Sequence, residues 1–358
     1  MNILNVAFPL SPVGCDAVGG AEQILTALDE ALVRTGHRSL VIACEGSCCA
    51  GELVATPARS ERTSSHAQPD LQAQHRATIE RVLAAEPIEL VHLHGLDFAT
   101  YLPRASVPVI ATLHLPPSWY PPTALPPMRP ATYLNCVSRA QARDCPRACG
   151  DLPVIENGVP TAALHWRGGK ADYVAWLGRL CPEKGVHLAI EAARRAGVPL
   201  RIAGRVFPFA AHETYFAEQI RPQLDAQCRF VGPVGFPQKP AFLGRARALL
   251  VTSTVAETSS LVAMEALACG TPVVAFRRGA LEGIVEPRVT GFLVQDTAGM
   301  AEAIAAAARL DPAACRATAL RRFSRERMTA RYLALYGQLI AAETATAALE
   351  RSLRHAAA

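Results

Sequence analysis

The sequence predicts an α/β protein made of two units, each with a parallel sheet covered by helices on both faces. Its length of 358 residues corresponds to about two domains. Short runs of apolar and β-branched residues alternate with helical stretches, which is the pattern of parallel strands joined by crossover helices. The pattern starts again after the turn-forming residues between 157 and 169, so the join between the units is placed there.

The first half of the chain begins with a short strand and an amphipathic helix. In the helix expected over 20–35, Ile24, Leu28 and Leu32 share one face. Further apolar runs predict additional strands, and helices fill the gaps between them. The expected strands are 2–8, 39–44, 89–93, 107–112 and 132–137, and the other expected helices are 70–84 and 138–145.

The second half repeats this alternation and ends in an Ala- and Leu-rich stretch that predicts a long helix from Arg325. The expected strands are 173–177, 200–203, 228–231, 248–252 and 272–276, and the expected helices are 184–196, 211–222, 237–246, 261–269 and 297–308.

The composition favours a folded protein of the cytosol. Half of the residues are hydrophobic and 19% are charged, which provides a core and excludes a disordered chain. No apolar run reaches the roughly 18–20 residues of a membrane span, and the N-terminus has the pattern of a strand rather than of a signal peptide. The eleven cysteines, an odd number, indicate free thiols in a reducing compartment. Their spacing does not match structural zinc, so no metal site is expected.

Charge is distributed unevenly along the chain. Residues 1–160 contain 11 Arg, no Lys and 15 acidic residues, a net charge of −4, whereas the remainder has 25 basic and 16 acidic residues, a net charge of +9. A basic second half suits an anionic small ligand. The charges are too dilute for a nucleic-acid-binding protein, in which basic residues form a patch.

Paired glycines lie between the first strand and the first helix. Gly14 and Gly19 have the spacing of a phosphate-binding loop, but Gly20 stands where that loop has lysine. Glycines here would let backbone N–H groups approach an anion at a helix N-terminus. A tight turn explains them equally well.

Two cations follow the first strand of the second unit. Arg179 and Lys184 lie five residues apart, before a helix. The planar guanidinium and the compact ammonium could together hold a diphosphate. A solvated basic loop is the alternative interpretation.

Two carboxylates, eight residues apart, occupy the segment that follows the 248–252 strand. Glu257 lies in the loop, and Glu265 lies in an otherwise apolar helix, where a charge is costly unless it is paired. Between them, hydroxyl residues mark the start of the helix, where free N–H groups point outward. These are Thr258, Ser259 and Ser260.

This last segment resembles the Glu-x7-Glu motif of glycosyltransferase family 4, the retaining nucleotide-sugar enzymes with the GT-B fold. Other segments match the family in the expected order over essentially the whole chain. They are Gly19-Gly20-Ala21-Glu22, Thr112-Leu113-His114, Asn157-Gly158-Val159, Gly178-Arg179 with Glu183-Lys184-Gly185, Arg278-Gly279-Ala280-Leu281-Glu282 and Thr290-Gly291-Phe292-Leu293-Val294. Ser259-Ser260 stand where the family commonly has Phe-Gly.

The resemblance implies a domain plan. Two Rossmann-like domains would face each other across a cleft, with residues 1–160 binding the acceptor and residues 161–335 binding the donor. The last residues, 336–358, would form a helix that packs back on the N-terminal domain.

The resemblance also implies roles for single residues. Arg179 and Lys184 would neutralise the leaving diphosphate, and Glu257 would bind hydroxyls of the transferred sugar. Glu265 would bind the ribose, and the N–H groups of Ser260 and Leu261, beside Ser259, would cap the diphosphate. Gly20 would let the first domain approach the donor, and His114 would hold a sugar hydroxyl or lie beside the acceptor.

The implied activity is that of a hexosyltransferase that keeps the anomeric configuration and needs no cofactor and no metal. UDP-glucose is the preferred donor by prevalence alone, and a soluble hydroxyl compound is the expected acceptor. Two alternatives stay open. One is a sugar-nucleotide epimerase or hydrolase on the same fold, and the other is a protein that binds nucleotide sugars without catalysis.

Overall fold

The computed structural model describes residues 1–14, 17, 19–57, 68–126 and 129–356, and the chain divides into two compact units. The first unit comprises Met1–Val137, Ala142–Ile155 and Met328–Ala358, and the second comprises Ser138–Gln141 and Glu156–Arg327. The main crossings from one unit to the other therefore fall a few residues before the boundaries at 160 and 335 that the sequence suggests.

The first unit is built on a six-stranded parallel sheet with the order β3-β2-β1-β4-β5-β6. Its strands are β1 (Asn2–Val6), β2 (Arg38–Cys44), β3 (Glu52–Thr56), β4 (Leu90–Leu93), β5 (Val109–Leu113) and β6 (Thr132–Cys136). Strand β3 was not expected from the sequence. It lies at the sheet edge and only its last residue, Thr56, is buried. Its apolar run is short, Leu53-Val54-Ala55, and is flanked by Glu52 and Thr56.

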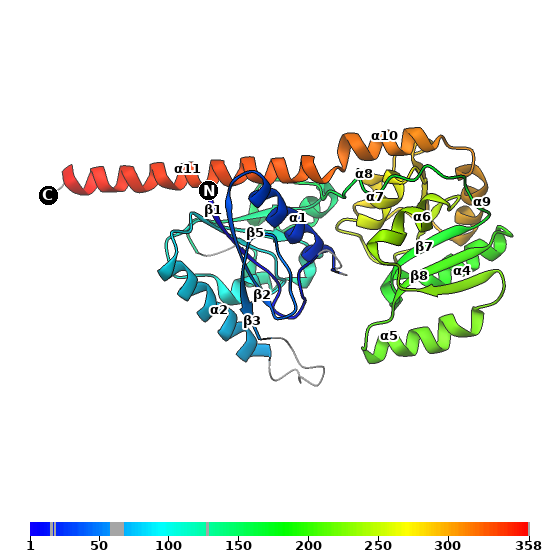
Figure 1. Cartoon of the computed structure of the whole chain (residues 1–358), viewed down its shortest axis with the longest axis horizontal. Coiled ribbons are helices and arrows are strands. Elements are labelled where there is room, and N and C mark those ends of the chain that lie inside the picture. The colour runs from blue at the N-terminus through cyan, green and yellow to red at the C-terminus, as the bar shows by residue number, and fades with distance from the viewer. Residues whose placement is uncertain (15–16, 18, 58–67, 127–128, 357–358) are drawn as a thin grey trace. The chain divides into compact units, whose positions relative to one another are not determined.

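Helices α1 (Gly20–Arg34) and α2 (Gln68–Ala85) lie beside this sheet, as Figure 1 shows. The apolar face of α1 is buried, as its spacing predicts, with Ile24, Leu28 and Leu32 almost fully enclosed. Helix α3 (Arg139–Asp144) is short and ends two residues before Pro146, which cannot continue a helix.

The second unit repeats the same topology. Its sheet has the order β12-β11-β10-β7-β8-β9, so in both units the first strand of the unit pairs with the second and the fourth. The strands are β7 (Val174–Arg179), β8 (Leu200–Arg205), β9 (Cys228–Gly232), β10 (Leu249–Val251), β11 (Val273–Phe276) and β12 (Gly291–Val294). In this order the connections diverge at β1/β4 and at β7/β10, and ligands of such sheets bind at the carboxyl ends of these strands.

The helices of the second unit are α4 (Val186–Arg195), α5 (Ala210–Tyr215), α6 (Lys239–Gly244), α7 (Leu261–Ala268), α8 (Leu281–Ile284), α9 (Thr297–Ala307) and α10 (Pro312–Arg322). The helix expected over 211–222 forms, but it is not an α-helix throughout. Helix α5 ends at Tyr215 and is followed by a π-helical turn, Phe216–Ile220, and a 3-10 turn, Arg221–Gln223. Pro222, which has no N–H to donate, lies in the last of these turns.

The last helix, α11 (Arg325–Ala356), belongs to the first unit from Met328 onward. Its Tyr332 and Tyr336 are fully buried there. The Tyr332 hydroxyl accepts a hydrogen bond of 3.0 Å from the Asn135 amide nitrogen, and the Tyr336 hydroxyl lies 2.5 Å from His92 Nδ1. These buried polar contacts fix the helix on the sheet of the first unit, at the ends of β4 and β6.

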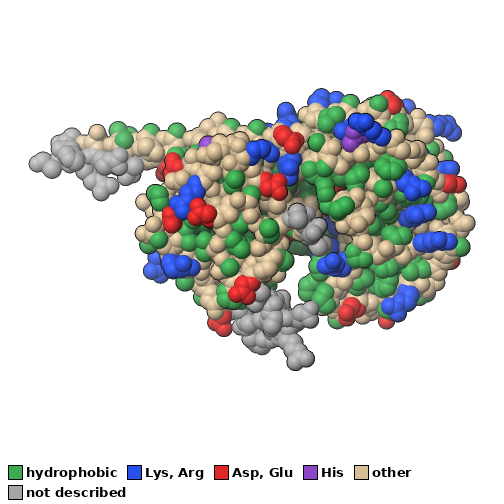
Figure 2. Space-filling view, viewed as in Figure 1, with side chains coloured by type: hydrophobic (Ala, Val, Ile, Leu, Met, Phe, Trp, Pro, Cys, Tyr) green, Lys and Arg blue, Asp and Glu red, His purple; other side chains and the backbone are tan. Residues whose placement is uncertain are grey.

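Over the part of the chain that the structure describes, no helix combines the length and the apolar character needed to cross a membrane. On the face drawn in Figure 2, the Lys and Arg side chains of the second unit lie scattered among uncharged groups. This distribution agrees with a basic but dilute surface.

Candidate active site

The loop after β7 is shaped by a glycine. Gly185 has a φ of 64°, in the left-handed region, and a Cβ atom there would collide with the carbonyl oxygen of Thr252. The Thr252 hydroxyl in turn donates a 3.0 Å hydrogen bond to the Lys184 carbonyl oxygen. The loop after β7 is therefore held closely against the loop after β10.

Lys184 extends from this loop to the first of the two carboxylates. Its Nζ lies 2.5 Å from Glu257 Oε1, and the Ser253 hydroxyl donates to the same oxygen. Glu257 is only 9% exposed, and its backbone oxygen accepts a 2.7 Å hydrogen bond from the Ala280 N–H. A nearly buried carboxylate is thus held by an ammonium group and a hydroxyl.

Arg179 is the last residue of β7 and is exposed. Within the described residues, no side-chain hydrogen bond or ion pair of Arg179 is formed. Its guanidinium is near Glu183, where it helps to hold the pKa of that carboxyl below its ordinary value. The main cause of that lowering is a hydrogen bond from the Glu183 backbone N–H. Arg179 therefore offers a cation to a ligand at this sheet edge.

Helix α7 begins in the same loop region. Ser260 is the N-cap residue and its side chain makes no capping hydrogen bond, so the N–H groups at Leu261 and beyond are left to other acceptors. The Ser259 hydroxyl is buried and has no hydrogen-bond partner in the described structure. Unsatisfied donors at a helix N-terminus favour an anion.

The second carboxylate, Glu265, is buried inside α7 at 4% exposure and pairs with a lysine that sequence reasoning missed. Lys239, at the start of α6, places its Nζ 2.6 Å from Glu265 Oε1. The chain has only three lysines among 36 basic residues, and two of them pair with the two carboxylates of the Glu-x7-Glu segment. A charged residue in an apolar helix predicts a cationic partner, but no local spacing links Glu265 to Lys239, which lies 26 residues earlier in the chain.

In the first unit, Gly20 is the first residue of α1 and is exposed. The N-cap residue is Gly19, where a Cβ atom would collide with the Glu22 carboxylate. Of the preceding glycine-rich segment, Cys15, Asp16 and Val18 lie outside the described residues.

His114 follows β5 and pairs with a second histidine. His114 Nε2 lies 3.0 Å from His94 Nδ1, and the two rings stack with centroids 5.3 Å apart. Burial lowers the pKa of His114 to about 3, and burial together with neighbouring imidazoles holds the pKa values of His92 and His94 well below the ordinary range. His114 is therefore a neutral group at pH 7, able to donate or accept a hydrogen bond.

The structure thus brings Lys184 and Glu257 into contact, places the other expected donor-side residues at the carboxyl ends of β7 and β10 or in the helix that follows β10, and places Gly20 and His114 at the carboxyl edge of the first sheet. In the second unit Arg179, Lys184, Glu257, Ser259, Ser260, Leu261 and Glu265 lie in or directly after the loops that follow β7 and β10. Cations, a helix N-terminus and carboxylates at the carboxyl ends of neighbouring strands are the groups that bind a phosphorylated compound that also carries hydroxyl groups.

Two cavities of about 230 Å³ lie away from these residues. One is lined by Arg201 and Arg229 near the starts of β8 and β9, at the opposite sheet edge, and the other by Leu335 and Leu339 of α11. Both are smaller than the roughly 300–1,000 Å³ of most small-molecule sites, so neither replaces the strand-end site.

Comparison with protein families gives two matches along the chain. Residues 18–163 match the model described as Glycosyltransferase Family 4, and residues 171–309 match the model described as Glycosyl transferases group 1. Together the two matched segments contain every candidate residue named above.

Individual proteins show the same similarity. The chain is 36% identical over 192 residues to a glycogen synthase of Mycobacterium tuberculosis, covering 50% of this chain and 44% of that protein. The aligned region is therefore less than half the length of this relative.

Solved structures match almost the whole chain. The sucrose-phosphate synthase of Thermosynechococcus elongatus is 20% identical, with a TM-score of 0.78 and coverage of 96% of this chain and 100% of that chain. HepE of Anabaena, solved in complex with UDP and glucose, is 21% identical, with a TM-score of 0.75 and coverage of 94% and 99%. At these identities the likeness shows that the folds are the same.

Proposed function

Because the chain belongs to glycosyltransferase family 4 and has the GT-B fold, we propose that it is a retaining hexosyltransferase that uses a nucleotide-diphosphate sugar and a hydroxyl acceptor. The observation that carries this proposal is the contact of Lys184 with Glu257, which joins the loop that follows Arg179 to the loop that leads into α7. The group assembles positive charge where a diphosphate would leave and a carboxylate where sugar hydroxyls would bind.

In this proposal the residues of the second unit act mainly through charge. Arg179 and Lys184 stabilise the negative charge that develops on the diphosphate as the bond to the sugar breaks. Backbone N–H groups of Ser260 and Leu261, next to the unpartnered Ser259 hydroxyl, bind phosphate oxygens. The leaving phosphate oxygen takes the proton of the attacking acceptor hydroxyl on the same face of the sugar, so no pair of general acid and base carboxylates is required.

The carboxylates position the donor. Glu257 accepts hydrogen bonds from hydroxyls of the transferred sugar, and Glu265 accepts them from the ribose. Gly20, without a side chain, leaves room for the donor beside the first unit, and neutral His114 holds a sugar or acceptor hydroxyl. The cations of Arg179 and Lys184 take the place of a divalent metal on the diphosphate, so we expect transfer by chelator-treated protein to be unchanged by added Mg²⁺.

UDP-glucose is the donor we propose. Support comes from HepE, a structural neighbour that was solved with UDP-glucose and with UDP and glucose. Curated relatives are named for different acceptors, glycogen in one case and inositol 3-phosphate in another. We propose a soluble hydroxyl compound as the acceptor class.

The decisive experiment compares Arg179→Ala and Lys184→Ala with the parent protein at saturating UDP-glucose. Each variant loses one group that stabilises developing charge, so turnover should fall by about 10²–10³-fold. The melting temperature should change little in Arg179→Ala and should fall in Lys184→Ala, because that change leaves the nearly buried Glu257 carboxylate without its cation. Arg247→Ala is the matched control, because Arg247 forms an ion pair of 2.8 Å with Asp172 at the opposite edge of the same sheet. Turnover close to that of the control in both variants would refute the proposed role.

Product analysis separates the proposed reaction from its alternatives. Proton NMR of the product should show the same anomeric configuration as the donor. A hydrolase or epimerase would consume UDP-glucose at full rate without any acceptor, and a non-catalytic protein would bind it without turnover.

A further inference from the structure

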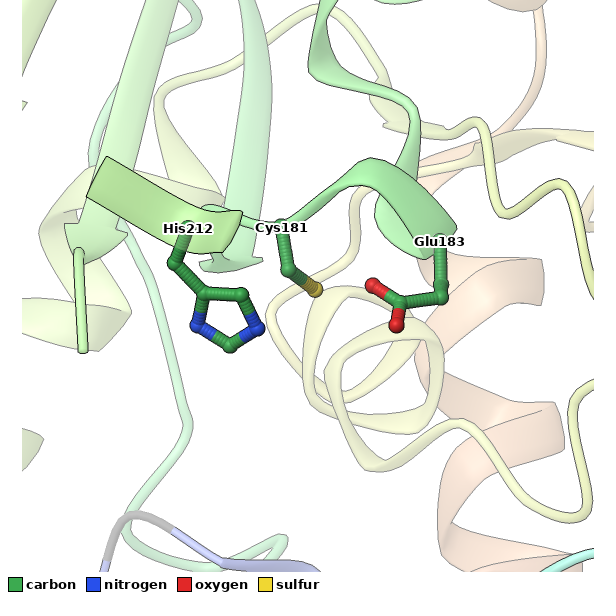
Figure 3. A group of neighbouring side chains, drawn as sticks. All are labelled: Cys181, Glu183 and His212. Carbon is green, nitrogen blue, oxygen red and sulfur yellow. The ribbon is translucent and has the colours of Figure 1, made fainter. Parts of the chain in front are cut away.

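A sulfur, a carboxylate and an imidazole come together in the second unit, on residues that the proposed reaction does not use. Cys181 and Glu183 belong to the loop after β7, and His212 is in the first turn of α5 (Figure 3). One ligand atom from each residue lies within 4.8 Å of the others. Segments far apart in the sequence therefore place three metal-binding groups at one point.

The three groups differ in how firmly they are held. Cys181 is 1% exposed and His212 is 9% exposed, whereas the Glu183 side chain is exposed. In Figure 3 the Cys181 sulfur lies between the His212 ring and the Glu183 carboxylate. Two ligands are thus fixed by packing, and the third can adjust its position by rotation in solvent.

The imidazole of His212 is not engaged by another protein group through Nδ1. This nitrogen is buried and has no hydrogen-bond partner among the described residues. The ring packs edge-on against Phe209, with centroids 5.2 Å apart, and this contact holds the ring in place without fixing its proton. In Figure 3, Nδ1, the nitrogen bonded to the ring carbon that carries the side chain, points away from Cys181, and the other ring nitrogen, Nε2, faces the sulfur. Nε2 is therefore the nitrogen that is available to a metal ion.

We propose that Cys181, Glu183 and His212 form a binding site for one zinc ion. Thiolate, imidazole and carboxylate are together the ligands of Zn²⁺, whereas Mg²⁺ and Ca²⁺ take oxygen ligands. On binding, the Cys181 thiol releases its proton to solvent as the Zn–S bond forms, while the neutral imidazole and the carboxylate bind through lone pairs. Water completes the fourth position of the tetrahedron.

The geometry needs only a small contraction. Bonds of about 2.0–2.3 Å to the metal place ligand atoms roughly 3.3–3.8 Å apart, so atoms within 4.8 Å must approach by about 1 Å. Glu183 can supply this movement because it is exposed. The ion would tie the turn that carries Lys184 to the start of α5. It is distinct from the Mg²⁺ that the transfer reaction is proposed not to need.

Cobalt substitution tests the proposal directly. The reduced, chelator-treated full-length protein is titrated with Co²⁺ and then with Zn²⁺. We expect one equivalent of Co²⁺ to produce the ultraviolet charge-transfer band of a cobalt–thiolate bond, and Zn²⁺ to remove the band. A rise in melting temperature with Zn²⁺ should accompany binding, since a ligand that binds only the folded state stabilises it.

Variants locate the site among the eleven cysteines. Cys181→Ser should abolish the thiolate band, and His212→Asn and Glu183→Gln should each weaken Co²⁺ binding by at least about tenfold. Cys228→Ser changes another buried cysteine of the same unit, and Cys145→Ser changes a thiol of the first unit that lies 3.6 Å from the Cys136 sulfur. Both controls should keep the band.

Several results would overturn the proposal. They are the lack of a thiolate band in the parent protein, a band that survives in Cys181→Ser, and a band that is lost in Cys145→Ser. Should Cys181→Ser fail to fold by circular dichroism, Glu183→Gln decides, because this exposed side chain can be changed without disturbing the core. Unchanged Co²⁺ affinity in that variant would also reject the three-ligand site.

Discussion

Glu265 shows how a single charged residue can be retained within an apolar helix. Its carboxylate is buried in α7 and is compensated by Lys239 at 2.6 Å. Removing one partner of a buried pair leaves the other uncompensated, which is more costly than the pair itself is stabilising. The pair therefore keeps the Glu265 carboxylate in place, where we propose that it binds the ribose of the donor.

We expect Glu265→Gln to raise the dissociation constant of UDP, because a ribose hydroxyl pair requires two acceptor oxygens and an amide supplies one. The melting temperature should fall as well, because Lys239 loses its charged partner. UDP titration by calorimetry and the melting temperature of the same preparation test this. Lys239→Met is the matched variant, because it removes the ammonium and leaves the carboxylate. A loss of melting temperature with unchanged UDP affinity in Glu265→Gln would assign the carboxylate a structural role only.

His114 is the residue at which the first unit is proposed to meet the reacting sugar. We expect His114→Ala to lower the rate of sugar transfer while leaving the affinity for free UDP unchanged, since the nucleotide is proposed to be held by residues of the second unit. UDP titration and initial rates on one preparation are the measurements. A large loss of UDP affinity would contradict the proposed position of this histidine.

At the scale of elements, the ends of β4 and β5 hold three imidazoles in a neutral state. His92 and His94 are at most 3% exposed, and His92 is hydrogen-bonded to Thr112 and Tyr336. Their pKa values and that of His114 lie below the ordinary value of 6.5, chiefly because burial disfavours the charged form. The unfolded chain therefore binds more protons than the folded chain below about pH 6.5.

This arrangement predicts an acid-sensitive first unit. The contribution of the histidines to stability is complete above about pH 6.5 and is lost as the pH falls below that value, toward the folded-state pKa of about 3 for His114. His94→Asn keeps a hydrogen-bonding group toward His114 and removes one titrating imidazole, so its melting temperature should fall less between pH 8 and pH 5 than that of the parent protein. Equal losses in the two proteins would show that other groups dominate.

The loops that follow β7 and β10 also act as one element. Gly185 permits their close approach, and the Thr254 N–H donates a 2.8 Å hydrogen bond to the Glu183 carbonyl oxygen. The side chains of Lys184 and Glu257 are consequently placed on adjoining backbone segments that support each other. A site built in this way gains its precision from backbone contacts rather than from the length of a flexible side chain.

At the scale of the whole molecule, charge separates the two halves of the chain. The first 160 residues carry a net charge of −4, and a net-negative surface gains nothing from an anionic bilayer. Arg139, Arg143 and Arg147 could form a local basic helix, but α3 ends at Asp144 and Arg147 begins a separate 3-10 turn after Pro146. The three arginines therefore do not share one helical face.

We accordingly expect no salt-sensitive binding of the protein to vesicles that contain anionic lipid, measured by flotation. Strong binding that is lost when Arg139, Arg143 and Arg147 are changed to alanine would contradict this expectation. That outcome would point to an acceptor attached to a lipid.

The local pattern of the sequence was sufficient to predict much of the fold. The alternation of apolar strands and amphipathic helices predicted two α/β units, and the resemblance of short motifs to family 4 predicted the GT-B fold that the solved structures confirm. Strand β3 was not predicted because its apolar run, Leu53-Val54-Ala55, is only three residues long and is flanked by polar residues. The change from α-helix to π- and 3-10-helical turns after Tyr215 was not predicted, because helical periodicity does not distinguish these turns.

The sequence by itself determined which residues are candidates for the proposed sugar transfer. Arg179, Lys184 and Glu257 stand out as charges that follow strands, and Glu265 as a charge in an apolar helix. Only the tertiary structure decided their partners. Lys239 pairs with Glu265, His94 pairs with His114, and His212 joins Cys181 and Glu183, although each pairing crosses from one element to another. Periodicity and spacing describe neighbours along the chain, whereas these contacts follow from the order in which parallel strands assemble and from the close packing of the loops at their ends.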